Sequence, residues 1–163
     1  MKRAFLDPWF WGQVAWLFAV GAGAPALAHR LGGSAAGAWL PVAGMALLVL
    51  GFWVFLAGVR DLGPNLTPAT RPRRDGELVT HGLYAHVRHP IYLGLILACT
   101  GWAAAWGNLL VTVMAGAGTA LYLGAKASVE ERKLLAQFPA YAEYRARVPM
   151  LFPGRTRADG SPR

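Results

Sequence analysis

Hydrophobic segments without a single charged residue alternate with short polar connections along the chain. Four such segments contain no Asp, Glu, Lys or Arg: 10–28, 38–59, 91–106 and 109–125. A helix that crosses a membrane needs roughly 20 apolar residues, with a range of about 17–25. The first two segments reach that length, and the shorter last two are separated by a predicted tight turn. The pattern predicts an all-α polytopic membrane protein with four transmembrane helices, the last two forming a helical hairpin.

Composition supports a membrane protein and removes several other classes. Of 163 residues, 55% are hydrophobic and only 15% are charged, whereas soluble globular proteins carry about 25% charged residues. Intrinsic disorder, a collagen-like repeat and a disulfide scaffold are excluded, because the only cysteine, Cys99, can form no internal bridge. The length fits one domain, residues 1–163.

The basic residues predict the orientation of the chain. Fifteen of the sixteen Lys and Arg residues lie before the first segment, between the second and third, or after the fourth, and Arg30 alone lies on the other side. Short cytoplasmic connections collect Lys and Arg. Both termini and the loop 60–90 are therefore predicted to be cytoplasmic, in a bacterial inner membrane. This topology also accounts for the net charge of +8, so we expect anionic lipid and not nucleic acid as the partner.

The N-terminal segment has a second interpretation. Lys2 and Arg3, an apolar stretch, and Ala26-Leu27-Ala28 resemble a cleavable signal peptide. The bulky Trp9-Phe10-Trp11 cluster favours retention as an interfacial anchor. Cleavage would leave the orientation of the other segments unchanged.

Helix contacts and polar ends can also be predicted. Gly116, Ala120 and Gly124 recur every four residues, a pattern that allows a neighbouring backbone to approach closely.

On the cytoplasmic side, Pro64, Pro68 and Pro72 predict an irregular loop. An amphipathic C-terminal helix is expected from Ser128 on, with the acidic pair Glu130-Glu131 at its start and a break or restart at Pro139. Its apolar stripe comprises Leu134, Leu135, Phe138, Tyr141, Tyr144 and Val148.

Three histidines, His81, His86 and His89, stand close together before the third segment. They lack a flanking Cys or carboxylate at ligand spacing, so we predict no metal site. Hydrogen bonding to a polar ligand at the membrane face is the alternative use, and His81 and His86 are the candidates for a general base.

The polar motifs around the second pair of segments resemble a known family. They read Gly82-x-Tyr84-x-x-x-Arg88-His89-Pro90-x-Tyr92-x-Gly94, then Glu130-Glu131-x-x-Leu134, then Phe138-x-x-Tyr141-x-x-Tyr144. This arrangement is similar to the integral-membrane isoprenylcysteine carboxyl methyltransferases and their relatives, the phospholipid N-methyltransferases. The resemblance covers about Leu78 to Pro153, and it implies S-adenosylmethionine as the methyl donor and an all-helical membrane fold.

The resemblance also implies roles for individual residues, within a cofactor region of about 76–94 and 126–148. Catalytic roles fall to Lys126 and Glu130, and Lys126 would bind the substrate. Lys126 stands where related proteins with a carboxylate substrate usually have Arg; a lysine keeps the charge but not the bidentate geometry. The cofactor-binding residues implied are Leu78, Val79, Tyr84, His89, Pro90, Ile91, Tyr92 and Glu130.

The expected function is therefore methylation of a lipophilic acceptor at the cytoplasmic membrane face, with a carboxylate favoured because it is ionised at neutral pH and needs no general base. Phospholipid or small-molecule N- or S-methylation is the alternative within the class. Two readings from other classes stay open: an NADPH-dependent enzyme similar to sterol reductases, and a non-catalytic membrane scaffold.

Overall fold

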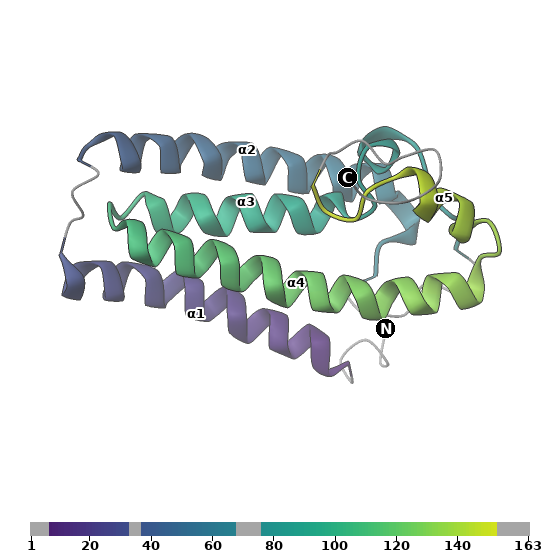
Figure 1. Cartoon of the computed structure of the whole chain (residues 1–163), viewed down its shortest axis with the longest axis horizontal. Coiled ribbons are helices and arrows are strands. Elements are labelled where there is room, and N and C mark those ends of the chain that lie inside the picture. Colours follow the sequence, from purple (N-terminus) through teal and green to yellow (C-terminus); the bar gives the residue numbers. More distant parts are fainter. Residues whose placement is uncertain (1–6, 33–36, 68–75, 153–163) are drawn as a thin grey trace.

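All the regular structure in the described residues is helical. The computed structural model describes residues 7–32, 37–67 and 76–152. Four long helices lie side by side, with the α1–α2 and α3–α4 connections at one end and α5 at the other (Figure 1). Two short 3-10 helices, η2 (Gly63–Asn65) and η3 (Gly82–Ala85), precede α3. The helices are α1 (Pro8–Leu31), α2 (Trp39–Leu62), α3 (Pro90–Ala104), α4 (Leu109–Gln137) and α5 (Tyr141–Arg147).

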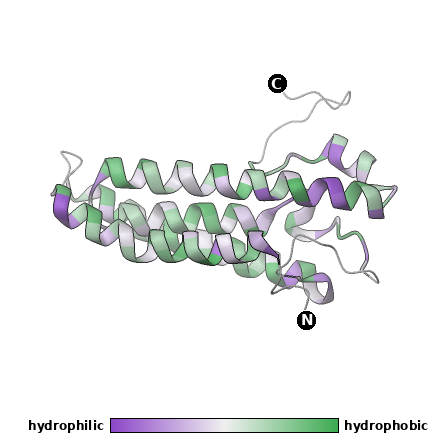
Figure 2. Ribbon diagram, turned by 90° about the horizontal axis from the view of Figure 1, so that it is seen from below, coloured by the Kyte–Doolittle hydropathy of each residue, from purple (hydrophilic) through white to green (hydrophobic). Residues whose placement is uncertain are grey.

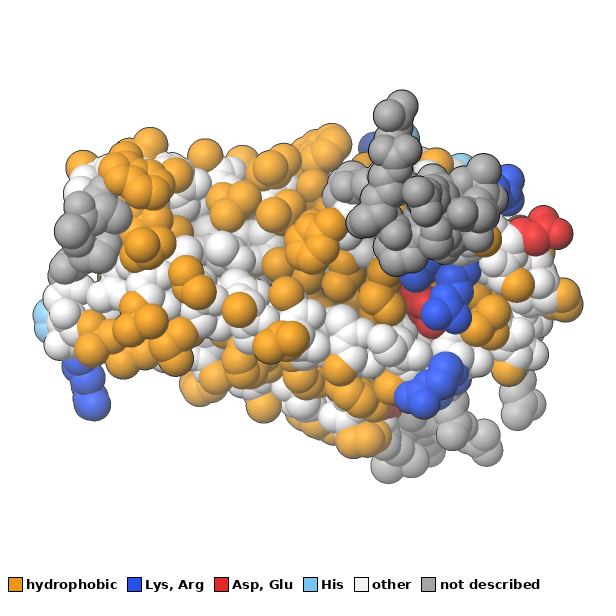
Figure 3. Space-filling view, in the orientation of Figure 1, with side chains coloured by type: hydrophobic (Ala, Val, Ile, Leu, Met, Phe, Trp, Pro, Cys, Tyr) orange, Lys and Arg blue, Asp and Glu red, His pale blue; other side chains and the backbone are white. Residues whose placement is uncertain are grey.

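Three of these helices, α1, α2 and α4, are long and apolar enough to cross a membrane. The α3 helix is apolar but has only 15 residues, fewer than the roughly 20 that span the hydrocarbon core. Large apolar side chains such as Phe18, Val42 and Leu121 are exposed along the shaft of the bundle. Hydrophobic side chains cover that shaft, and charged groups gather at the end where α5 lies (Figures 2 and 3). The fold is that of an integral membrane protein.

The α2 and α3 helices pack backbone against backbone. Gly44, Gly51 and Gly58 recur every seven residues on one face of α2, and all three are buried. A methyl group built on Gly51 would collide with the backbone of Ala98, and one on Gly94 would lie 2.5 Å from the backbone nitrogen of Phe55. Small residues at such a crossing let two helices approach closely.

The face of α4 that was expected to admit a neighbouring backbone behaves differently. A methyl group on Gly116 would meet the side chain of Thr100, and one on Gly124 only that of Leu151. The prediction for this face is therefore wrong: α4 meets side chains there, and the closest helix contact is the one between α2 and α3.

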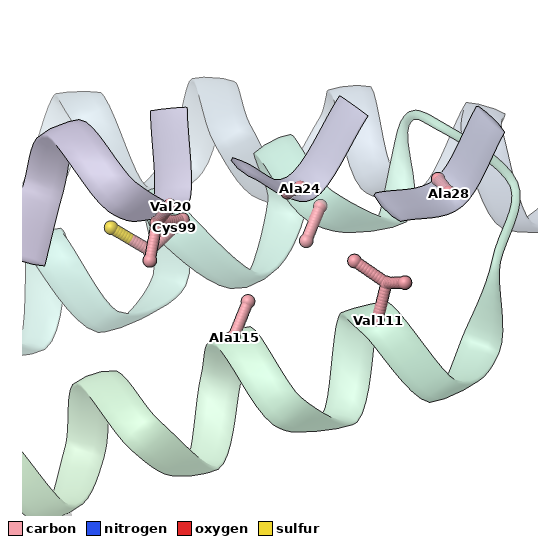
Figure 4. Close-up of a cluster of buried hydrophobic side chains, with 7 residues drawn as sticks. Val20, Ala24, Ala28, Cys99, Val111 and Ala115 are labelled. Atoms are coloured by element: carbon pink, nitrogen blue, oxygen red, sulfur yellow. The ribbon is translucent and has the colours of Figure 1, made fainter. Parts of the chain in front are cut away.

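Small apolar residues also fill the space between α1, α3 and α4 (Figure 4). Cys99 is buried within this cluster. Polar side chains hold α1 in place alongside it: the indole of Trp16 donates to Thr119 Oγ1 at 3.0 Å, and the hydroxyl of Tyr122 donates to the Trp9 carbonyl at 2.9 Å. The cluster comprises Val20, Ala24, Ala28, Cys99, Ala103, Val111 and Ala115.

The C-terminal region corrects one prediction and confirms another. No new helix begins at Ser128, because α4 continues without interruption to Gln137 and carries Glu130 and Glu131 in mid-helix. The change from apolar to charged residues marks the end of the membrane-facing part and not the end of the helix. The break at Pro139 is confirmed: Phe138 caps α4 and a short helix, α5, starts at Tyr141.

The described basic residues gather at one end of the bundle. Arg60 lies in the last turn of α2 and Arg88 precedes α3, whereas Arg30 lies in the last turn of α1, at the opposite end. Other basic residues counted in the orientation argument lie outside the described residues, as do two of the prolines of the predicted loop. These are Lys2, Arg3, Pro68, Arg71, Pro72, Arg73, Arg74, Arg155, Arg157 and Arg163.

Candidate active site

A tight turn places Tyr84 at the end of the bundle. Gly82 has φ +59°, where a side chain would be strained and would meet the carboxylate of Asp61. Asp61 Oδ2 instead accepts a hydrogen bond of 2.8 Å from the amide of Leu83, which ties η3 to the end of α2. Burial raises the pKa of the Tyr84 hydroxyl well above its usual range, and nearby Tyr144, Asp61 and Glu130 add to the effect. The Tyr84 phenol is therefore a neutral hydrogen-bond donor at physiological pH.

The start of α3 holds His89 and Tyr92 face to face. Pro90 occupies the first helical position, where its missing N–H costs nothing, and its side chain is fully buried. The rings of His89 and Tyr92 stack with centroids 5.4 Å apart and an interplanar angle of 4°. The hydroxyl of Tyr92 donates to Glu130 Oε1 on α4, and His89 Nδ1 lies 3.8 Å from Glu130 Oε2.

Lys126 and Glu130 are one helical turn apart on α4, so both face the same side. Lys126 is 3% exposed. Its ammonium donates to Gln13 Oε1 on α1 and lies 5.3 Å from the centroid of the Tyr92 ring, within the range of a cation–π contact.

The two adjacent glutamates serve different purposes. Residues one apart on a helix point about 100° away from each other, so Glu131 faces Arg88 and His89 instead. Glu131 Oε1 accepts from Arg88 Nε at 2.8 Å and lies 3.2 Å from His89 Nε2. Arg88 Nη1 also donates to the carbonyls of Arg145 and Val148, each at 2.7 Å. Glu131 thus fixes the C-terminal segment, and Glu130 remains at the cavity.

These side chains surround a cavity of about 510 Å³ at the charged end of the bundle. Every residue that the sequence assigned to the cofactor lines it except Pro90, which is fully buried at the first position of α3. Lys126, assigned to the substrate, also lines it. The wall is completed mainly by apolar and aromatic side chains from α1, α2, α4 and α5 and from the residues that follow η2 and α4: Phe10, Phe55, Val59, Leu62, Leu66, Leu134, Phe138, Tyr141 and Tyr144.

Sequence reasoning overlooked several residues of this site. Arg88, Tyr141 and Tyr144 belonged to the quoted motifs but received no role. The hydroxyl of Tyr144 donates to the carbonyl of Tyr84 at 2.7 Å, which links α5 to η3. Gln13 had no signal at all, because it lies 113 positions from Lys126 in the sequence.

His81 and His86, the candidate general bases, are exposed and do not line the cavity. Within residues 7–32, 37–67 and 76–152, no three His, Cys, Asp or Glu side chains are grouped so that they could hold a metal ion.

Apolar helices around a cavity with charged and aromatic walls define a membrane protein with a ligand site at one end of its bundle. The profile of the phospholipid methyltransferase family matches residues 39–140. The chain therefore belongs to this family of membrane methyltransferases, and α1 lies outside the matched range.

Two similar proteins are named as methyltransferases, and a third is named as a metal-resistance protein. The chain is 29% identical over 112 residues to a protein-S-isoprenylcysteine O-methyltransferase of Schizosaccharomyces pombe, covering 67% of this chain and 48% of that protein. It is 42% identical over 91 residues to a methanethiol S-methyltransferase of Bradyrhizobium diazoefficiens, covering 53% and 28%. A cobalt-zinc-cadmium resistance protein of Cupriavidus metallidurans is 38% identical over 81 residues, covering 50% and 38%. The chain thus spans less than half the length of each of these relatives.

The fold matches that of a eukaryotic intramembrane Ras methyltransferase, an isoprenylcysteine carboxyl methyltransferase. The TM-score is 0.68 at 27% sequence identity, over 74% of this chain and 44% of that one. The resemblance inferred from the motifs is thereby confirmed.

Proposed function

We propose that this protein transfers a methyl group from S-adenosylmethionine to the carboxylate of a lipophilic acceptor at the cytoplasmic face of a bacterial inner membrane. The observation that carries the proposal is the composition of the cavity. It offers a carboxylate and aromatic rings, from Glu130, Tyr84 and Tyr92, together with the Lys126 ammonium and many apolar side chains. A cationic donor and an anionic, lipophilic acceptor suit this combination of groups.

The side chains that line the cavity and the size of the cavity both fit S-adenosylmethionine. Ligand pockets commonly measure about 300–1,000 Å³, and this one measures about 510 Å³. Glu130 would attract the cationic groups of the donor, and aromatic rings would contact the sulfonium and the adenine. The residues that would hold it are Leu78, Val79, Tyr84, His89, Ile91, Tyr92 and Glu130, with Pro90 supporting them. When bound, S-adenosylmethionine supplies an activated methyl group.

The chain's own residues would position the acceptor and exclude water. Lys126 would bind the acceptor carboxylate by charge and hydrogen bonding. The apolar walls from α1 and α2 would hold its hydrocarbon part and keep water out. The acceptor oxygen would have to lie close to the methyl carbon and in line with its bond to sulfur, so that the new carbon–oxygen bond forms as that bond breaks and S-adenosylhomocysteine leaves. A carboxylate is ionised at neutral pH, so no residue has to remove a proton. Glu130, fixed by the Tyr92 hydroxyl, would keep the donor in register.

The proposal includes a topology. The α3 helix would be a fourth, short transmembrane crossing that forms a hairpin with α4. Its close packing on α2 would hold it within the bundle. The end with α5, η3 and the cavity faces the cytoplasm, where most of the basic residues gather. A soluble donor can enter there, and the acceptor can enter from the lipid.

A thiol acceptor is the second candidate, favoured by the similarity to a methanethiol S-methyltransferase. The Lys126 ammonium would then stabilise a thiolate, and the thiol proton would have to leave first.

The test is methyl transfer from labelled S-adenosylmethionine by the purified protein to acceptors that share a hydrocarbon chain: dodecanoate and dodecanethiol, with phosphatidylethanolamine as a third. We expect labelled methyl ester from dodecanoate, and a rate at least about 10-fold lower in Lys126→Met, because a charge-assisted contact is lost. Lys133→Met, seven residues further along α4 and outside the cavity lining, is the charge-matched control. Methylated thiol or phosphatidylethanolamine would move the acceptor to the alternatives. No methylation and no donor binding would favour a scaffold or a nicotinamide enzyme.

A further inference from the structure

The side chain of Gln13 reaches the cavity from α1 and contacts Lys126. Its Oε1 accepts a hydrogen bond from the Lys126 ammonium, and both residues line the cavity. Phe10, one turn earlier on α1, lines it as well. Gln13 therefore belongs to the site, although α1 lies outside the range that matches the family profile.

The Lys126 ammonium is buried without an acidic partner in contact. Its residue is 3% exposed, yet within residues 7–32, 37–67 and 76–152 no carboxylate forms an ion pair with it. The neighbouring Glu130 accepts a hydrogen bond from the Tyr92 hydroxyl, and the charges of Glu130 and Asp7 act on the ammonium through space. A buried charge is normally paired, because removing it from water is costly. An anionic group in the cavity would place a counter-charge in direct contact with the ammonium.

Lys126 and Gln13 present two neighbouring hydrogen-bond donor groups. A lysine ammonium has three N–H groups, and only one is used by Gln13; a glutamine amide whose oxygen is occupied still has two N–H groups on Nε2. A carboxylate has two acceptor oxygens, so one can accept from Lys126 and the other from Gln13. A thiolate has a single acceptor atom, and a protonated amine would be repelled by the ammonium.

We propose that Gln13 and Lys126 together form a carboxylate-binding fork, and that Gln13 on α1 determines the preference of this protein for acidic lipophilic acceptors. The inference rests on the proposed function, which it deepens by assigning acceptor specificity to a residue of α1. Gln13 holds the ammonium in place through Oε1 and contacts the acceptor through Nε2.

The substitution Gln13→Glu separates this role from a structural one. A carboxylate at position 13 would form an ion pair with Lys126, so a purely structural contact between α1 and α4 would be kept or strengthened. A fork that binds a carboxylate would be destroyed, because the new charge repels the ligand and occupies the ammonium. Gln13→Ala removes one donor and leaves the ammonium free.

The experiment measures binding of dodecanoate and of its methyl ester to the detergent-purified full chain, with and without S-adenosylhomocysteine. We expect wild-type protein to bind the acid at least about 10-fold more tightly than the ester. That preference should fall about threefold in Gln13→Ala, which keeps the ammonium, and disappear in Gln13→Glu. Trp16→Phe is the matched control: it removes the α1–α4 hydrogen bond to Thr119, one turn away, and should keep the preference.

Two results would overturn the fork: equal binding of acid and ester by the wild type, or an unchanged preference in Gln13→Glu. Failure of the proposed function gives a different pattern, in which the acid preference follows Gln13 as stated but neither S-adenosylmethionine nor its demethylated product binds.

Discussion

Replacing Arg88 by methionine should detach the C-terminal segment from the start of α3. The Arg88 side chain is 9% exposed and pairs with Glu131, which is 3% exposed. It also donates to the carbonyls of Arg145 and Val148. Arg88 is thus the main side-chain link between α3 and the segment that begins with α5, whose Tyr141 and Tyr144 line the cavity.

The size of the effect follows from these contacts. Removing one partner of a buried ion pair costs about 3–5 kcal/mol, because the other charge is left uncompensated. Glu131 keeps His89 Nε2 at 3.2 Å as a partner, so we take the lower end, about 3 kcal/mol. Two backbone contacts also persist without the Arg88 side chain, from the amides of Arg88 and His89 to the carbonyls of Pro149 and Met150. Opening of the segment should therefore become roughly 100-fold more frequent, at about 1.4 kcal/mol per factor of ten.

Amide hydrogen exchange in detergent measures this opening directly. We expect the amides of Tyr144 and Val148 to exchange roughly 100-fold faster in Arg88→Met, while those in the middle of α2 are unchanged. Arg145→Met is the matched control: Arg145 also contacts Glu131, at 3.4 Å, but its side chain is 51% exposed, and exposed pairs contribute about 0–1 kcal/mol. Protection in Arg88→Met within about threefold of wild type, or an equal loss in both variants, would refute the reasoning.

Two further predictions concern packing and pH. Gly51→Ala should lower the thermal unfolding midpoint, because the added methyl meets the α3 backbone and overpacking costs about 1–3 kcal/mol. The control is Gly21→Ala, which has open space around it and should leave the midpoint unchanged or raise it. An equal response of both variants would contradict the close α2–α3 packing. Burial raises the pKa of Tyr144 to about 12. The unfolded phenol ionises near pH 10, so the unfolded chain binds fewer protons between these values and stability should fall as pH rises from about 10 to 12. Tyr144→Phe should make that fall shallower in alkaline unfolding, and an unchanged slope would refute the assignment.

Hydrophobic length was a sufficient guide to the long helices, because each crossing must satisfy its own backbone hydrogen bonds within the membrane. It was a poor guide to helix ends outside the membrane. The apolar run ends before Lys126, yet α4 continues to Gln137, because charged residues such as Glu and Lys are good helix formers and need no new start. The helix break at Pro139 was predictable, because proline lacks a backbone N–H donor and restricts the conformation of the residue before it.

The sequence was a poorer guide to which helices pack closely against each other. The every-fourth-residue pattern on α4 favoured that helix for close contact, whereas the seven-residue spacing of Gly44, Gly51 and Gly58 carries the real one. Both spacings place small residues on one face of a helix, and only the position of the neighbour decides which face is used.

Only the part of the site that the family motifs supply was predictable from the sequence. Motif resemblance assembled Tyr84, His89, Tyr92 and Glu130, and the cavity places them together. It also selected the cavity-facing Glu130 of the acidic pair, but it assigned no role to Glu131, which anchors Arg88. The contribution of α1 was hidden altogether, since a single glutamine in an apolar helix carries no spacing signal.

The central claim is that this cavity binds S-adenosylmethionine, and calorimetric titration of the detergent-purified protein with S-adenosylmethionine and S-adenosylhomocysteine tests it most directly. The account predicts saturable binding of both, weakened at least about 10-fold by Glu130→Gln, because a hydrogen bond to a charged group contributes about 1.5–3 kcal/mol. Glu143→Gln, which removes the same charge from the exposed face of α5, should bind as the wild type does. Absence of saturable binding by folded wild-type protein, or equal binding by both variants, would contradict it.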